Sequence, residues 1–110
     1  MKNGDKIKNV CRQIVREFQP EKIILFGSQA YGDPDSDSDT DLLVILPFEG
    51  RRTEQGIKIR QRIKSSLPLD LLIRTPKEVT ESLSLGDIFI KDIIENGKVL
   101  YESDYARMDR

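Results

Sequence analysis

The chain has 110 residues, 37% of them hydrophobic and 34% charged, which predicts a single domain with a small core and a heavily charged surface. Its 18 basic and 19 acidic residues give a net charge of −1, so no basic field favours a nucleic-acid partner. The absence of His excludes His-based catalysis and His-ligated zinc, and the single cysteine excludes an intrachain disulfide. Without a membrane-length apolar run or a signal-peptide pattern, we expect a cytoplasmic protein with no membrane partner.

The first half of the chain predicts one helix and two strands. Apolar residues recur at helical spacing up to Pro20, which ends the helix: Ile7, Val10, Cys11, Ile14, Val15 and Phe18. Residues 23–26 form a short apolar run that reads as a buried strand ending at Gly27. Residues 27–38 predict a turn-rich loop, with room for a helical turn at Ser28, and residues 39–46 predict a second strand.

The second half predicts helices on both sides of a third strand. Residues 51–66 read as a polar, basic helix with sparse apolar contacts, including Ile57, and residues 69–73 read as a strand. Thr75, Pro76 and Glu78 form a capping-box helix start, and a last helix ends near Gly97. A short strand follows at 99–101. The fold class is α/β (α+β), a mixed β-sheet of about four strands flanked by helices, with a domain at 1–101 and a flexible tail at 102–110.

Carboxylates recur at every second position after Gly32: Asp33, Asp35, Asp37, Asp39 and Asp41. In an extended segment they point the same way, and their mutual repulsion calls for a cation. A calcium EF-hand loop is excluded, because no register supplies Gly at position 6 and Glu at position 12. A solvated acidic turn explains the first three aspartates. It explains Asp39 and Asp41 poorly, because these run directly into an apolar strand.

Asp70 gives an independent signal, because it lies within the apolar run 69–73 and is expected to be buried. A buried carboxylate pairs with a cation, binds a metal ion or shifts its pKa. Pairing with an arginine of the basic helix is therefore one interpretation. The other combines Asp70 with Asp39 and Asp41 as a hard-oxygen site of the kind that Mg²⁺ prefers. Gly27 and Ser28, between a strand and a possible helix start, could hold a phosphate, although the pair alone is a weak signal.

Two segments taken together resemble a known signature. Residues 27–32 (GSQAYG) and 38–44 (SDTDLLV) are similar to the G-S-x-A-x-G…S-D-x-D-L-x-V pattern of the DNA polymerase beta nucleotidyltransferase superfamily. The short length resembles its minimal nucleotidyltransferase branch, often encoded beside HEPN-domain proteins as the antitoxin. The signature covers residues 27–44, and the order of elements extends the resemblance over about residues 5–101.

The resemblance implies a role for each matching residue. Asp39, Asp41 and Asp70 would be the catalytic carboxylates and would hold two Mg²⁺ ions, with Asp70 helping to deprotonate the acceptor. Gly27 and Ser28 would bind the β- and γ-phosphates of ATP. Many members carry Arg where this chain has Tyr31, which puts a positive phosphate clamp at that position in doubt.

The resemblance also implies a partner, because the chain shows no domain that could bind an acceptor. The expected reaction is transfer of AMP from ATP to a tyrosine hydroxyl of a HEPN-type toxin. A non-catalytic antitoxin that works by occlusion and transfer to a small-molecule hydroxyl are the alternatives, and an oligomer is left open. Part of the last helix is expected to face another chain, because it is too crowded with apolar residues for one stripe: Ile88, Phe89, Ile90, Ile93 and Ile94.

Overall fold

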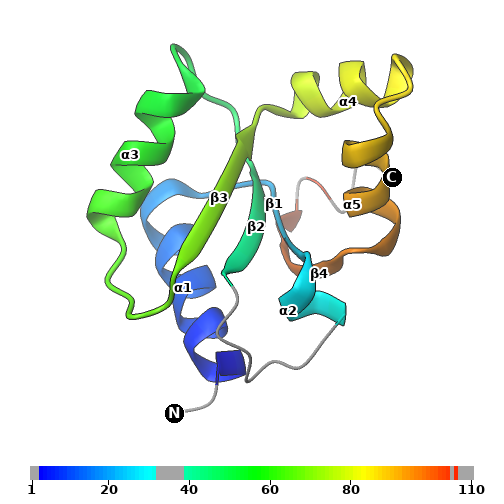
Figure 1. Ribbon diagram of the computed structural model, residues 1–110. Helices are drawn as coiled ribbons and strands as arrows, with labels where there is room; N and C mark the ends of the chain where they lie inside the picture. Colours follow the sequence, from blue (N-terminus) through cyan, green and yellow to red (C-terminus); the bar gives the residue numbers. More distant parts are fainter. Residues whose placement is uncertain (1–2, 32–38, 105, 107–110) are drawn as a thin grey trace.

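The computed structural model describes residues 3–31, 39–104 and 106 of the chain (Figure 1). Asp33, Asp35 and Asp37 of the acidic run lie outside the described residues, as does most of the predicted tail. Nine helices and strands occur in the described residues, and they follow the predicted order with the helical turn at Ser28 included: α1 (Asn3–Phe18), β1 (Lys22–Phe26), α2 (Ser28–Tyr31), β2 (Thr40–Ile45), α3 (Arg52–Arg62), β3 (Leu69–Arg74), α4 (Pro76–Ser84), α5 (Ile88–Asn96) and β4 (Lys98–Glu102).

The four strands form one mixed sheet in the order β3-β2-β1-β4. β1 pairs antiparallel with both β2 and β4, whereas β2 and β3 run parallel, with α3 as the connection between them. A parallel pair requires such a crossover, because the chain must return to the end of the sheet from which it started. The crossover places the beginnings of β2 and β3 side by side.

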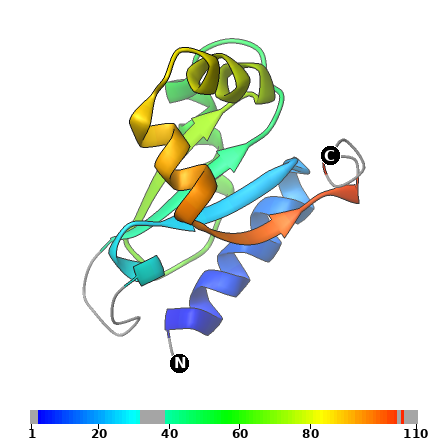
Figure 2. The same ribbon diagram turned by 90° about the vertical axis from the view of Figure 1, so that its right-hand side faces the viewer.

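Helices cover both faces of the sheet, which explains why β1 and β2 read as continuous apolar runs. On one face, α1 and α3 pack on alternate strand residues, in a core that includes Ile14, Ile23, Leu42, Val44 and Ile59. On the other face, α4 and α5 pack on the intervening residues, in a core that includes Ile24, Leu43, Val79, Ile90 and Ile93. Figure 2 shows α1 and α5 on opposite sides of the sheet. Cys11 is 8% exposed within the first core, where burial raises the pKa of its thiol.

The helix boundaries have local causes. The capping box predicted for α4 is present: the Glu78 backbone N–H donates to the Thr75 hydroxyl at 3.1 Å, and the Thr75 N–H donates to the Glu78 carboxylate at 2.8 Å. α3 is shorter than the predicted 51–66, because Ile63 is already extended and Lys64 exchanges hydrogen bonds with the Gln13 side chain of α1. Of the apolar contacts predicted for this helix and the residues after it, Ile59 is buried and Ile63 and Leu67 pack on the first core, whereas Ile57 is half exposed.

β4 extends through Glu102, and the Ser103 N–H then donates to the Glu21 carbonyl at 2.8 Å. None of the helices in residues 3–31, 39–104 and 106 combines the length and the apolar character that crossing a lipid bilayer requires.

Candidate functional site

The end of β1 and the beginnings of β2 and β3 meet at one end of the sheet. Asp41, the second residue of β2, is paired with Phe26 of β1 on one side and with Asp70 of β3 on the other. Neighbouring strands in a sheet are about 4.8 Å apart, so paired residues of the same orientation have adjacent side chains. The sheet register therefore brings together Asp41 and Asp70, which are 29 positions apart in the sequence.

The two carboxyl groups interact directly. The pKa of Asp41 is raised above its ordinary value of 3.8, first by burial and then by the negative charges of Asp70 and Asp39. A side-chain hydrogen bond with Asp70 raises it further. Negative charge is thus concentrated at this point of the sheet.

Asp70 is exposed, so the prediction of a buried carboxylate was wrong. β3 is an edge strand, and its burial pattern shows that only Ile73 of its six residues is fully buried. An apolar run at a sheet edge keeps one side open to solvent, which the sequence pattern does not reveal. In the described part of the chain no Lys or Arg forms an ion pair with Asp70, so the interpretation as an arginine partner has no support.

Asp39 lies directly before β2 and is exposed, and it is close enough for its charge to raise the pKa of Asp41.

Thr40, between the two aspartates, is fully buried, and its hydroxyl has no hydrogen-bond partner among the described residues. Sequence reasoning missed this residue. The alternation of a strand could have indicated it, because a residue between two carboxylates on one side of a strand points to the opposite side.

Gly27 follows β1 and allows a close approach of the backbone to Asp41. Its φ is +76°, a conformation that L side chains rarely adopt. A Cβ added at this position would collide with the Oδ2 atom of Asp41, and it would lie 3.2 Å from the Cγ atom. Ser28 begins α2 and is exposed, while the next residue, Gln29, is 5% exposed. The sequence did not single out Gln29.

These residues suit a hard cation by their chemistry. Among the described residues no Lys or Arg forms an ion pair with any of the three carboxylates, and two of them, Asp41 and Asp70, interact directly. The described residues contain no group of three or more His, Cys, Asp or Glu side chains already arranged to hold a metal ion. The register brings Asp41 and Asp70 into contact, whereas Asp39 acts on Asp41 through its charge alone. A cation would relieve the repulsion that raises the pKa of Asp41.

Replacing Gly27 with Ala tests the contact between the glycine and Asp41. Gly86→Ala is a matched control, because Gly86 has a φ of +77° and an added Cβ there meets nothing within 4 Å. The left-handed conformation should cost each variant about 1–2 kcal/mol of unfolding free energy. Gly27→Ala should cost more in a urea titration, because the new Cβ displaces Asp41. Equal losses of unfolding free energy in the two variants would show that the contact between Gly27 and Asp41 does not contribute to stability.

The raised pKa of Asp41 predicts a pH-dependent gain in stability when its charge is removed. The Asp41 carboxyl group binds its proton more tightly in the folded protein than in the unfolded chain. Protonated Asp41 therefore favours the folded state below pH 3.8, and this contribution to stability is lost as the pH rises through the raised pKa. In EDTA at pH 7, Asp41→Asn should therefore melt a few degrees above the wild type, and the difference should shrink towards pH 4. Asp92→Asn, an exposed site on α5, should show no such trend. A lower melting temperature for Asp41→Asn at pH 7 would contradict the repulsion.

Comparisons with known proteins identify the family of the chain and support its fold. The sequence profile described as "Nucleotidyltransferase domain" matches residues 5–101, while the curated proteins contain no significant match. One similar solved structure is described as the toxin-antitoxin MntA-HpeT in a mutant form with two aspartate-to-glutamate substitutions. It is 18% identical, with a TM-score of 0.51, and the alignment covers 96% of this chain and 77% of the other. That likeness concerns the fold, and together with the family profile it confirms the predicted mixed α/β fold of the polymerase-beta type. Because the family profile spans nearly the whole chain, the protein belongs to the nucleotidyltransferase domain family.

Proposed function

We propose that this chain is a magnesium-dependent nucleotidyltransferase that transfers AMP from ATP to a hydroxyl group of a partner protein. The observation that carries the proposal is the contact between Asp41 and Asp70 beside Gly27. A domain that only binds a partner has no need for two carboxylates in contact. An enzyme that binds divalent cations and phosphates does need adjacent carboxylates, together with a backbone that can approach the phosphates closely.

In this proposal Asp39, Asp41 and Asp70 hold two Mg²⁺ ions, and Gly27 and Ser28 hold the β- and γ-phosphates of ATP. When bound, the ions supply charge stabilisation for the attacking and leaving oxygens. Gly27 permits close backbone approach, because it has no side chain between the end of β1 and Asp41. Thr40 is buried between Asp39 and Asp41, and the alternation of an extended backbone places the two aspartates on the same side.

The proposed reaction is a single displacement at the α-phosphorus of ATP. The acceptor oxygen forms a bond to the α-phosphorus, the bond to the oxygen that bridges the α- and β-phosphates breaks, and pyrophosphate leaves. The acceptor proton passes to the carboxylate of Asp70. The exposure of Asp70 on an edge strand supports this role, since an acceptor arriving from solvent can reach it. ATP as the donor places the reaction in the cytoplasm.

An exposed apolar surface beside the site supports a protein as the acceptor. We call it the α4–α5 patch: Leu83, Leu85, Ile88 and Phe89, which are 41%, 86%, 82% and 55% exposed. The Phe89 ring packs edge-on against Phe26, with centroids 5.9 Å apart, and Phe26 directly precedes Gly27. The patch is thus continuous with the proposed nucleotide site, as expected of a surface that docks a macromolecule.

The partner in this proposal is a HEPN-type toxin, which presents a tyrosine hydroxyl and is silenced by receiving AMP. The fold similarity to a protein described as toxin-antitoxin MntA-HpeT supports an antitoxin role. The α4–α5 patch also favours a second function, in which the chain silences its partner by occlusion without chemistry.

Magnesium and ATP should stabilise the protein together. ATP should raise the melting temperature more with Mg²⁺ than with EDTA, because metal and phosphates complete each other's coordination. At a ligand concentration of about 100 times Kd, the stabilisation should be about 2.7 kcal/mol. Asp39→Asn and Asp70→Asn should lose the magnesium-dependent part, whereas Asp92→Asn should keep it. The same increment in Asp39→Asn would mean that the nucleotide binds elsewhere.

Transfer to a protein is tested with a purified HEPN-type toxin as the acceptor. Incubation with Mg-ATP should increase the intact mass of the toxin by one or more AMP units, and Asp70→Asn should abolish the gain. Tandem mass spectrometry should place the AMP on a tyrosine. A toxin that is bound and silenced with no gain in mass would assign the chain to occlusion. A nucleotide-dependent melting shift with neither binding nor transfer would exclude both partner functions and leave the acceptor to be sought among small molecules.

A further inference from the structure

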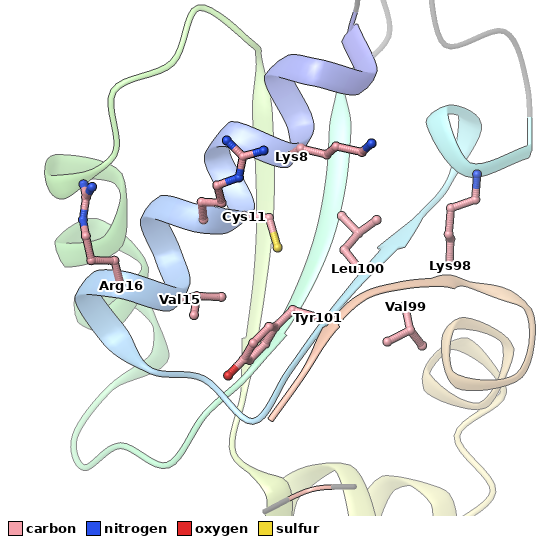
Figure 3. Close-up of a pocket in the computed structure, with 9 residues that line it drawn as sticks. Lys8, Cys11, Val15, Arg16, Lys98, Val99, Leu100 and Tyr101 are labelled. Carbon is pink, nitrogen blue, oxygen red and sulfur yellow. The ribbon is translucent and has the colours of Figure 1, made fainter. Parts of the chain in front are cut away.

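A groove lies between α1 and β4, away from the carboxylates of the proposed nucleotide site (Figure 3). Its volume is about 520 Å³, and its walls come from one side of α1 and from the strand at the edge of the sheet. Cys11 and Val15 point from α1 into the groove, and Leu100 and Tyr101 of β4 face them. The floor is therefore apolar.

The rim of the groove is positively charged. Four of its nine lining residues are cationic, none is acidic, and three of the four lie on α1: Lys8, Arg12, Arg16 and Lys98. Those on α1 are four residues apart, which sets them in a row with steps of about 6 Å. Within the described residues, the ion pair between Arg16 and Glu17, at 3.7 Å, is the single one that involves this rim. The row is thus a largely uncompensated line of positive charge.

The other wall of the groove is an open strand edge. β4 is the last strand of the sheet, and no described residue forms a strand on its outer side. Such an edge presents outward backbone N–H and C=O groups that can pair with a further strand. Val99 is 47% exposed and points away from α1, so a side chain on an added strand could pack beside it.

We propose that this groove binds an extended segment of a partner protein, which adds as a strand to β4 and carries glutamates at alternate positions. Alternate side chains of a strand are about 6.6 Å apart on one face, which matches the 6 Å steps of the cationic row. The methylenes of each glutamate lie over Cys11 and Val15, and the carboxylates reach Lys8, Arg12 and Arg16. The intervening residues face Val99, where β-branched side chains fit.

Strand addition explains two features of the groove together. Backbone pairing with β4 supplies affinity, and the row of cations selects acidic residues. This binding does not depend on the proposed nucleotidyltransferase activity, because none of the nine lining residues belongs to the carboxylate site. It is therefore testable without ATP or Mg²⁺.

The probe is a fluorescein-labelled peptide of alternating glutamate and valine, EVEVEVE, capped at both ends and titrated with the full chain by fluorescence anisotropy. We expect saturable binding that weakens as salt rises from 50 to 500 mM, because salt screens the charge pairs. The double variant Lys8→Glu and Arg12→Glu should bind about tenfold more weakly. The matched control is Lys58→Glu with Arg60→Glu, two exposed positions on α3 with the same charge change, and its affinity should stay within about twofold of the wild type.

Three further peptides and one oligonucleotide complete the test. EVEPEVE lacks one backbone donor and should bind several-fold more weakly if β4 pairs with the peptide. KVKVKVK should not bind, and a scrambled peptide of the same composition, EEVEVVE, should bind more weakly than EVEVEVE. Circular dichroism melting curves confirm that each protein variant is folded.

Several results would overturn the proposal. No binding of EVEVEVE, equal binding by the Lys8 and Arg12 double variant, or equal affinity for EVEPEVE would each exclude strand addition at this groove. Tighter binding of an eight-nucleotide oligothymidylate, lost in the same double variant, would instead assign the groove to single-stranded nucleic acid.

Discussion

The contact between Asp41 and Asp70 is the constraint on which the proposed site depends. Two carboxylates of like charge meet because β2 and β3 are parallel and begin at the same end of the sheet. Burial and the charges of Asp70 and Asp39 raise the pKa of Asp41, so the arrangement costs stability when no cation is bound. A protein keeps such a cost where it serves a function, as at sites that bind metal ions or perform acid–base chemistry.

The two-sided core makes this repulsion tolerable. β2 lies between β1 and β3, and five consecutive residues of this segment, Leu42–Leu46, are buried. One set of alternating side chains packs on α1 and α3, and the other packs on α4 and α5. Asp41 therefore belongs to a central strand that is packed by helices on both faces. Gly27 completes the site, because any side chain there would displace the Asp41 carboxylate.

The surfaces around this core differ in chemistry and position. The α4–α5 patch is apolar and joins the site through the contact between Phe26 and Phe89. The groove between α1 and β4 is apolar at its floor and cationic at its rim. β3 and β4 are the two edge strands, so the proposed acceptor side and the proposed pairing edge lie at opposite edges of the sheet.

The sequence by itself determined the order of the elements, the cap at Thr75 and the family signature at Gly27, Ser28, Asp39 and Asp41. These features are local, because hydrophobic periodicity, capping chemistry and a short motif each depend on residues that are close together in the sequence. Tertiary structure alone decided the pairing of Asp41 with Asp70, the exposure of Asp70 and of Ile57, and the charged rim of the groove. Each of these depends on which strands are neighbours and which lie at an edge. Strand order is set by the packing of segments far apart in the chain, so the apolar run around Asp70 could not show that one of its sides faces water.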